Sequence, residues 1–344
     1  GGRLLIAATH GRGMYRIDAG PLAQDEPTER VSVVHATCAQ ANDASNTAAI
    51  SGDGRFVVFS SFATNLLPSA DGNGATSDIF RHDRQSCQTL LMSVSTSGAW
   101  SNGSSSWPSI SDDGRFVAFH SSATNLVAGD AAGLTDIFVR DVTLGQTALV
   151  TGVPATRNQE QPVISGDGRH VAFVSAPVQP APPGEFDDIY VHDRLTGRTT
   201  RLTVGVGAAA PDNASRWPVI SYTGRFVAFV SNATNLVPDD GNGALSDIFE
   251  CDRDPDENGV FDEGNAVITL VSVPDPLTGE VAANGASDYP AISAYGEALA
   301  FSSSADNLVP EGDTNFHSDV FVRYHDTGEV YRASVPAGGG EANG

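Results

Sequence analysis

Short apolar runs separated by turn-forming residues fill this sequence from end to end, and no run shows a helical period. In residues 56–59 (Phe-Val-Val-Phe), apolar side chains occupy both of the alternating faces that a β-strand presents. Such a strand must be buried on both sides, as an inner strand of a packed sheet is. Asp-Gly pairs stand before several of these runs and are typical of tight hairpin turns. The pattern predicts an all-β protein.

One phrase, Ile-Ser-Gly-Asp-Gly-Arg-Phe-Val-Ala-Phe, recurs with small variations. Its copies begin at Ile50, Ile110, Ile164, Ile220 and Ile292. The arginine of the phrase is followed by its next counterpart after 60, 54, 56 and 72 residues, where glutamate replaces it in the last copy. A period in this range indicates a repeat architecture rather than several unrelated domains.

Each repeat contains four predicted strands, here called A to D. Strand A ends in Ile-Ser, strand B is the apolar run after the arginine, strand C begins with Asp-Ile-Phe or a close variant, and strand D is rich in Thr. About 50 residues for four antiparallel strands is the size of a β-propeller blade. Five full four-stranded antiparallel blades are therefore predicted over residues 46–96, 106–153, 160–206, 216–274 and 288–336.

The N-terminal segment resembles part of one further blade. Residues 2–8, 13–18 and 29–34 align with strands B, C and D, so that residues 1–36 lack only strand A. The alternative is that residues 1–20 end a preceding domain.

The C-terminal segment, residues 337–344, ends in Glu-Ala-Asn-Gly and matches the lead-in to strand A at residues 281–285. A strand A that follows this lead-in would complete the N-terminal blade. We therefore expect residues 1–344 to form a single β-propeller with six blades, one of which is split or incomplete.

The phrase Ser-x-Asp-Gly-Arg entering an apolar strand, as at residues 51–55 and 165–169, resembles the repeat of TolB-like β-propellers. The resemblance covers nearly the whole chain. It implies a propeller of the secreted or periplasmic type, in a family whose members mostly bind other proteins or serve as accessory domains. The likeness is specific for fold and weak for function, because one fold carries many functions.

Acidic residues dominate the charge, with 42 Asp and Glu against 19 Lys and Arg and a formal net charge of −23. Such a chain repels phosphate groups, so we expect no nucleic-acid partner. No apolar window is long enough for a membrane-spanning helix, so we expect no membrane insertion. The acidity fits a cationic partner, above all Ca²⁺, and it equally fits solubility in an extracellular setting.

The chain has three cysteines, Cys38, Cys87 and Cys251. Cys38 belongs to a connection between strands D and A, and Cys87 belongs to a hairpin between strands C and D. These connections lie at opposite ends of a blade, and bridged Cα atoms must lie within about 7 Å. We therefore expect no bridge between Cys38 and Cys87 and three free thiols.

The sharpest local pattern is the acidic segment between strands C and D of the fourth full blade. Counted from Asp254, side-chain oxygens fall at positions 1, 3, 5 and 9, with glycine at position 6, which is the order of an EF-hand-type Ca²⁺ loop. Position 12 departs from that order, since it holds Asn265 in place of glutamate. The alternative is an acidic, solvated loop. The predicted ligands are Asp252, Asp254, Asp256, Asn258, Asp262 and the carbonyl of Val260.

The loops between strands B and C repeat Ala-Thr-Asn-Leu or a close variant, and then run into Asp, Gly and Asn, as at residues 71–74 and 239–243. Two interpretations stay open for these residues. Tight turns favour Asp, Asn and Gly for conformational reasons, and the same oxygens could form weak cation sites. The third copy departs from the pattern with a proline-rich stretch at residues 177–183.

Three aromatic residues, Trp107, Trp217 and Tyr289, each precede the proline of strand A. We expect them near the mouth of the central channel, where they could bind a sugar or a peptide. The alternative is packing between blades, the commoner role of such rings. The repeated arginine, for example Arg55, is expected to have a structural role in pairing with Asp or carbonyl groups of neighbouring blades.

No catalytic motif stands out, and no Gly-x-Ser-x-Gly sequence is present. The hypothesis is a non-catalytic extracellular or periplasmic propeller, stabilised by Ca²⁺, that binds a protein partner or self-assembles. The alternative is a propeller that binds or cleaves glycans at the channel mouth. Carboxylates close to the three aromatic residues would favour the alternative. A third interpretation is one domain of a larger surface protein.

Overall fold

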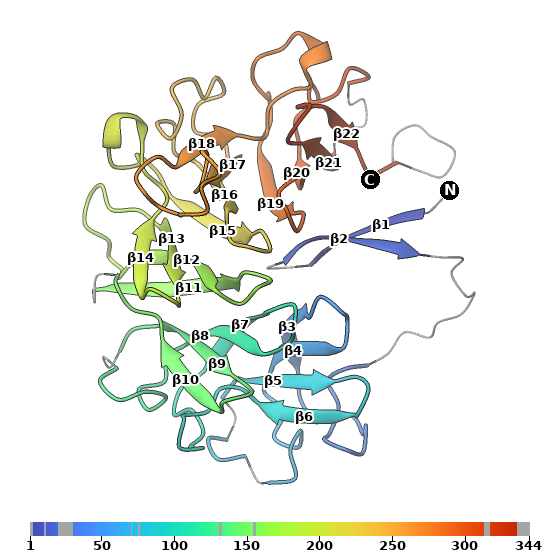
Figure 1. The fold of residues 1–344 in the computed structure, drawn as a ribbon, viewed down its shortest axis with the longest axis vertical. Coiled ribbons are helices and arrows are strands. Elements are labelled where there is room, and N and C mark those ends of the chain that lie inside the picture. Colours follow the sequence, from blue (N-terminus) through green and yellow to red (C-terminus); the bar gives the residue numbers. More distant parts are fainter. Residues whose placement is uncertain are drawn as a thin grey trace.

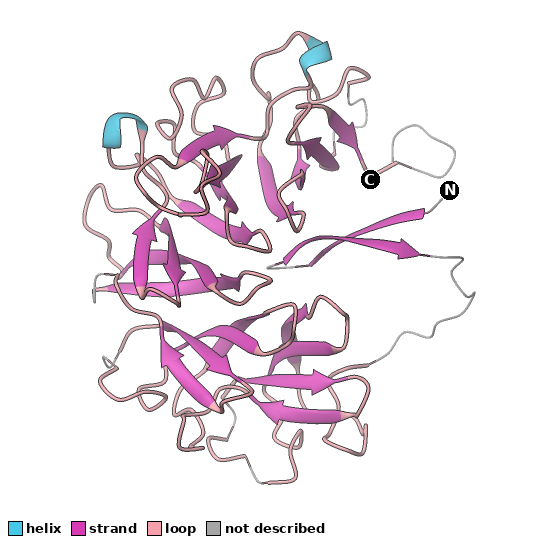
Figure 2. Ribbon diagram, viewed as in Figure 1, coloured by secondary structure: helices cyan, strands magenta, loops and turns pink. Residues whose placement is uncertain are grey.

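The computed structural model describes residues 3–9, 12–19, 30–69, 71–74, 76–130, 133–153, 156–312 and 317–335, and only the backbone of the first two stretches. Within these residues, regular structure is β-strand apart from two single 3-10 turns (Figure 2). The turns are η1 (Val206–Ala208) and η2 (Pro276–Thr278). The predicted all-β class is confirmed.

The described strands form five four-stranded antiparallel sheets and one two-stranded sheet, and each sheet uses consecutive strands. The two-stranded sheet pairs β1 (Arg3–Thr9) with β2 (Arg12–Ala19). The four-stranded sheets are, in chain order, β3 (Ser45–Ile50), β4 (Phe56–Ser61), β5 (Asp78–Asp83) and β6 (Gln88–Leu91); β7 (Ser105–Ile110), β8 (Phe116–Ser121), β9 (Asp136–Asp141) and β10 (Gln146–Leu149); β11 (Arg157–Ile164), β12 (His170–Pro177), β13 (Asp188–Asp193) and β14 (Arg198–Arg201); β15 (Ser215–Ile220), β16 (Phe226–Ser231), β17 (Asp247–Asp252) and β18 (Val267–Leu270); β19 (Ser287–Ile292), β20 (Ala298–Ser303), β21 (Asp319–Tyr324) and β22 (Val330–Arg332).

The four-stranded sheets follow one another in an arc, with the first strand of each sheet innermost and the fourth outermost (Figure 1). Neighbouring inner strands contact one another in the order β3, β7, β11, β15 and β19. The β1–β2 sheet lies in the opening between the first and last four-stranded sheets, and β2 contacts β15 and β19. This is the predicted β-propeller of four-stranded blades; a count of six blades stays a prediction.

Aromatic pairs across the second and third strands hold each sheet together. Phe59 on β4 lies opposite Phe80 on β5 with ring centroids 5.9 Å apart. Three other sheets repeat this Phe–Phe pair, and the sheet β11–β14 has Phe173 opposite Tyr190. The rings of Phe59 and Phe80 are almost completely buried, as the apolar character of both strand faces predicted. Each such residue stabilises the fold by about 1.5–3 kcal/mol through burial alone.

Neighbouring sheets meet at the turn between the first and second strands. Gly114 in this turn has φ = +72°, and a Cβ there would lie 2.2 Å from the ring of Phe56 on the preceding sheet. Glycine is therefore required both by the backbone conformation and by the close approach of the ring. The turns also hydrogen-bond to each other, since Gly52 N–H donates to Asp112 O at 3.1 Å and Asp112 N–H donates to Gly166 O at 2.9 Å.

The repeated arginine pairs with the last residue of the third strand in its own sheet. Arg55 donates to both carboxylate oxygens of Asp83, at 3.0 Å and 2.7 Å, and this ion pair holds the pKa of Asp83 far below its usual range. Three further sheets repeat the pair as Arg115–Asp141, Arg169–Asp193 and Arg225–Asp252. The partner lies in the same sheet rather than in a neighbouring one.

In four of the five four-stranded sheets, the loop between the second and third strands hydrogen-bonds to the segment that leads into the first strand, through a Thr-Asn pair or, at residues 306–307, an Asp-Asn pair. Asn102 accepts from Thr124 N–H at 2.8 Å and its own N–H donates to Asn125 Oδ1 at 3.0 Å. Equivalent hydrogen bonds form at residues 42 with 64–65, 212 with 234–235, and 284 with 306–307. The sheet β11–β14, whose loop is rich in proline, shows none among the described residues.

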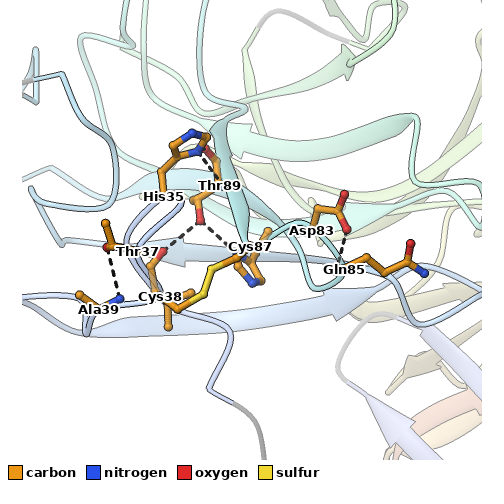
Figure 3. The surroundings of a disulfide bond; sticks show 10 residues. His35, Thr37, Cys38, Ala39, Asp83, Gln85, Cys87 and Thr89 are labelled. Carbon is orange, nitrogen blue, oxygen red and sulfur yellow. Dashed lines mark hydrogen bonds between the residues drawn. A yellow bond between two sulfur atoms is a disulfide. The ribbon is translucent and has the colours of Figure 1, made fainter.

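A disulfide joins Cys38 to Cys87, with their Cα atoms 6.3 Å apart, so the prediction of no bridge between them is wrong (Figure 3). Residues 33–40 form a small hairpin, closed by a bridge between Val33 and Gln40, that lies along strand β6. Thr89 Oγ1 donates to Val33 O at 3.0 Å, and Ala36 N–H donates to Cys87 O at 2.8 Å. The segment that contains Cys38 therefore extends along β6 to the β5–β6 hairpin, which contains Cys87, instead of staying at the other end of the sheet.

Strand D of the N-terminal partial blade was predicted over residues 29–34. Among the described residues, the one β-bridge that residues 30–34 form is that between Val33 and Gln40, and β1 and β2 pair with no third strand. Residues 337–344, the predicted lead-in to a missing strand, lie outside the described residues. The split blade stays a prediction.

Candidate functional site

Each inner strand bends at one residue, and the bend presents that residue's side chain differently from its neighbours. The register of pairing shifts at this point in all five inner strands. The residue at the shift has a positive φ, which is unfavourable for residues other than glycine and is kept only where the surrounding structure imposes it. The five equivalent residues are Thr47 (φ 30°), Trp107 (53°), Gln161 (52°), Trp217 (53°) and Tyr289 (55°).

The structure brings two of the three predicted aromatic residues together. The rings of Trp217 and Tyr289 stack with centroids 4.8 Å apart and an interplanar angle of 15°, while Tyr289 remains 55% exposed. Trp107 occupies the equivalent place on β7. It is separated from Trp217 on β15 by the inner strand β11, whose equivalent residue is Gln161. Gln161 Oε1 accepts a hydrogen bond from the backbone N–H of Trp217 at 3.0 Å.

Charged groups lie immediately beside this stack. The guanidinium of Arg216 lies 5.0 Å from the centre of the Trp217 ring and 4.0 Å from Asp288 Oδ1. Burial raises the pKa of Glu160, and the nearby carboxyl of Asp187 raises it further. Burial also raises the pKa of Asp187, while the positive charges of Arg157 and, to a smaller extent, Arg216 lower it.

We call these six residues the inner-strand cluster: Glu160, Asp187, Arg216, Trp217, Asp288 and Tyr289. The sequence interpretation named only its aromatic members. Glu160, Arg216 and Asp288 each stand one residue before the bend of their strand. The first two sheets have uncharged residues, Asn46 and Ser106, at this position. An alignment of the five repeats at this position would therefore have identified the three charged residues.

In the predicted Ca²⁺ loop, the two outermost carboxylates pair with arginines. Asp262 accepts from Arg253 Nε at 2.9 Å and from Nη2 at 2.6 Å, and Asp252 accepts two hydrogen bonds from Arg225, each at 2.8 Å. This differs from the predicted shell, in which both carboxylates face the ion. The reason is that a guanidinium supplies the positive charge that these carboxylates require.

The remaining predicted ligands bond among themselves. Asp254 accepts from the backbone N–H groups of Asn258 and Gly259, each at 3.0 Å. Asn258 Nδ2 donates to Asp256 at 3.0 Å, and its Oδ1 accepts from Val260 N–H at 2.7 Å. Ca²⁺ binding by this loop stays a prediction.

Within the described residues, no helix has the length and apolar character that crossing a membrane requires. No cluster of three or more His, Cys, Asp or Glu side chains with metal-binding geometry occurs in the same part of the chain.

No protein-family model matches the sequence, and no curated protein matches it either. Among solved structures, oligogalacturonate lyase in complex with manganese matches with a TM-score of 0.52 and 12% identity, over 84% of this chain and 64% of the lyase chain. At that identity the likeness shows the fold alone.

Two TolB structures are also among the matches. TolB from Acinetobacter baumannii has a TM-score of 0.46 and 16% identity, over 87% of this chain and 56% of that protein. A putative TolB from Agrobacterium tumefaciens has a TM-score of 0.46 and 18% identity, over 85% of this chain and 81% of that protein. The chain thus spans little more than half of the first TolB. It has a β-propeller fold, and TolB proteins are among the structures that it resembles.

Proposed function

We propose that this chain is a non-catalytic binding propeller whose inner-strand cluster holds a cationic segment of a protein partner. The observation that carries the proposal is the Trp217–Tyr289 stack between β15 and β19, with Asp288 beside Tyr289 on β19. Glu160 on the inner strand β11 and Asp187 just before β13 add two further carboxyl groups.

The cluster already accommodates one cation. Arg216 lies over the ring of Trp217 and beside Asp288, which is how an aromatic ring and a carboxylate recognise a guanidinium. Tyr289 carries the more exposed ring of the stack. A lysine or arginine of a partner would meet the same combination of ring and carboxylate there, and the net charge of −23 would attract it from a distance.

An extracellular or periplasmic location belongs to the same proposal. The bridge between Cys38 and Cys87 supports it, because structural disulfides form and persist in oxidising compartments.

Binding can be tested with an array of short peptides in which the positions of lysine and arginine vary, read out by fluorescence anisotropy. We expect basic peptides to bind, more weakly at high salt, and Tyr289→Ala to lower the affinity at least about tenfold. Tyr331→Ala is the matched control, since that ring is also about half exposed but lies on the outer strand β22. Equal loss in both variants, or no preference for basic peptides, would refute the proposal.

Glycan binding or cleavage is the second candidate. The observation that favours it is the set of carboxyl groups near the aromatic residues. Burial raises the pKa of both Glu160 and Asp187, and the charge of Asp187 raises the pKa of Glu160 further. Glycosidases use two carboxyl groups with separated pKa values. The lyase match concerns an oligogalacturonate, but an acidic cluster disfavours an anionic sugar. Neutral oligosaccharides are therefore the substrates to test, with Glu160→Gln expected to abolish any release of reducing ends. Turnover unaffected by Glu160→Gln would remove this candidate.

A further inference from the structure

The third strand of every sheet begins with a buried aspartate. All five side chains are at least nine-tenths buried, and a buried carboxylate is retained only with hydrogen bonds and a counter-charge. The five residues are Asp78, Asp136, Asp188, Asp247 and Asp319.

In two sheets the counter-charge is an arginine of the fourth strand. Arg201 on β14 donates to Asp188 at 2.7 Å, and Arg157 on β11 adds a second guanidinium at 3.5 Å. Arg332 on β22 lies 3.5 Å from Asp319. Arg201 and Arg332 are equivalent, since each lies opposite the aromatic residue two positions after the aspartate.

The other three sheets have leucine at that position, namely Leu91, Leu149 and Leu270. No ion pair joins Asp78, Asp136 or Asp247 to a basic side chain within the described residues.

Instead, each of these three aspartates meets a second carboxyl group from the preceding loop. Asp240 lies close enough to Asp247 for their charges to repel, and both side chains are buried. Asp130 acts on the buried Asp136 in the same way. Asp71 acts on Asp78 through its charge.

The loop between β16 and β17 also contains buried oxygens that no described donor reaches. Asp247 Oδ1 accepts from Ser272 at 2.7 Å and from Asn242 Nδ2 at 3.2 Å. Its Oδ2, together with Asp240 Oδ1 and Asn242 Oδ1, has no hydrogen-bond partner among the described residues. Asp240 and Asp247 are 8% and 1% exposed, so water does not compensate freely.

The equivalent loops repeat this feature in part. Asn73 Oδ1 and Thr76 Oγ1 are buried without a partner beside Asp78, and so is Asp130 Oδ1 beside Asp136. A cation bound between these carboxyl groups would give the unpartnered acceptors a partner.

We propose that the loop between β16 and β17 binds a Ca²⁺ ion through Asp240, Asn242 and Asp247, and that the equivalent loops at Asp78 and Asp136 bind the same ion. Carboxylate and amide oxygens are the ligands that Ca²⁺ takes, and a divalent ion balances two carboxylates. The ion takes the place that a guanidinium holds in the sheets with Arg201 and Arg332. These sites are separate from residues 252–262 and from the inner-strand cluster.

The test is calorimetric titration of CaCl₂ into chelator-treated protein. We expect Asp240→Asn to abolish binding of one of the ions, and Asp239→Asn to leave the titration unchanged. Asp239 is the matched control, because it is the exposed neighbour of the buried Asp240. Heat that Asp240→Asn leaves intact and Asp256→Ala removes would place the ion in the 252–262 loop and overturn the proposal, as would the absence of heat.

Thermal unfolding gives an independent readout whose sign changes. In chelator, Asp240→Asn should raise the melting temperature, because it removes repulsion from Asp247; in excess Ca²⁺ it should lower it relative to the unchanged protein, because ligand binding stabilises only the latter. A variant that raises the melting temperature equally in both conditions would overturn the proposal.

A graft tests the same point without removing a ligand. Leu270→Arg places a guanidinium where Arg201 stands in its own sheet, and we expect it to lower the affinity of this loop for Ca²⁺ at least about tenfold. If a folded Leu270→Arg variant binds Ca²⁺ with unchanged affinity, the proposal that the ion takes the place of an arginine is wrong.

Discussion

The guanidinium of Arg253, which has no solvent-exposed surface, forms two parallel hydrogen bonds with the carboxylate of Asp262. Arg253 also donates to Gly224 O at 2.5 Å and lies 5.0 Å from the centre of the Phe261 ring. The long connection between β17 and β18 is thus fastened to the turn between β15 and β16 by charge that the chain itself carries.

Removal of this carboxylate should destabilise the protein strongly. Asp262→Asn leaves a buried arginine without its counter-ion, a change that costs about 3–5 kcal/mol. Urea unfolding of the variant measures it. Asp256→Asn, an exposed acid of the same loop, should change the free energy of unfolding by less than about 0.5 kcal/mol. Equal effects of the two substitutions would contradict the assigned role of the ion pair.

Thiol titration of the denatured, unreduced protein should find one free thiol, that of Cys251. Replacing both bridged residues, Cys38 and Cys87, by serine should cost on the order of 2–4 kcal/mol, since the bridge closes a separation of 49 residues in the unfolded chain. Replacing Cys251, which is buried and unbridged, by serine serves as the control for thiol counting and should leave none. Three thiols in the unchanged protein would refute the bridge.

Acid should weaken the sheet interface at His170. This side chain is 1% exposed, both ring nitrogens lack a hydrogen-bond partner among the described residues, and burial, assisted by Arg253, lowers its pKa to about 4. Because the folded pKa lies below the unfolded value of about 6.5, the stability contributed by neutral His170 is complete above pH 6.5. It is lost as the pH falls through 4.

Phenylalanine occupies the equivalent position in three other sheets, as at Phe56. His170→Phe should therefore raise the free energy of unfolding by about 1–3 kcal/mol at pH 7 and flatten its decline between pH 6.5 and pH 4. Asp167, Arg169 and Asp193 also act on this imidazole through their charges, and they stay in place in the variant. An unchanged pH profile would show that another group causes the decline.

Gly114→Ala should cost more than a positive φ alone explains. The added methyl would strike the ring of Phe56, whereas a Cβ at Gly197, with the same φ of +72°, meets nothing within 4 Å. We expect Gly197→Ala to cost about 1–2 kcal/mol and Gly114→Ala about 1–3 kcal/mol beyond that. Chemical unfolding of both variants gives the difference, and equal costs would mean that the Phe56 ring moves aside.

The repeats made the four strands of each sheet predictable, because turn chemistry and doubly buried strands leave clear marks in the sequence. The bridge from Cys38 was missed because its connection folds as a hairpin along β6, and no local pattern encodes where such a hairpin lies. The pairing of Asp262 with Arg253 could not be predicted, because alternate carboxylates form the same sequence pattern whether a metal or an arginine pairs with them. The charged neighbours of Trp217 become visible only when equivalent residues of different repeats are set side by side.

The hydrogen bonds between the inner turns have a direction. Asp112 accepts from Gly52 of the sheet before it and donates to Gly166 of the sheet after it, and Tyr222 likewise accepts from Asp167 and donates to Ala294. Each inner turn therefore donates a hydrogen bond to the next sheet and accepts one from the sheet before it. Such a head-to-tail contact can be repeated any number of times unless the rotation between units closes a ring. Each joint uses backbone groups of the inner turn alone, so loops elsewhere in a repeat can differ in length, as those between β16 and β18 and between β12 and β13 do, without changing how the inner turns are joined.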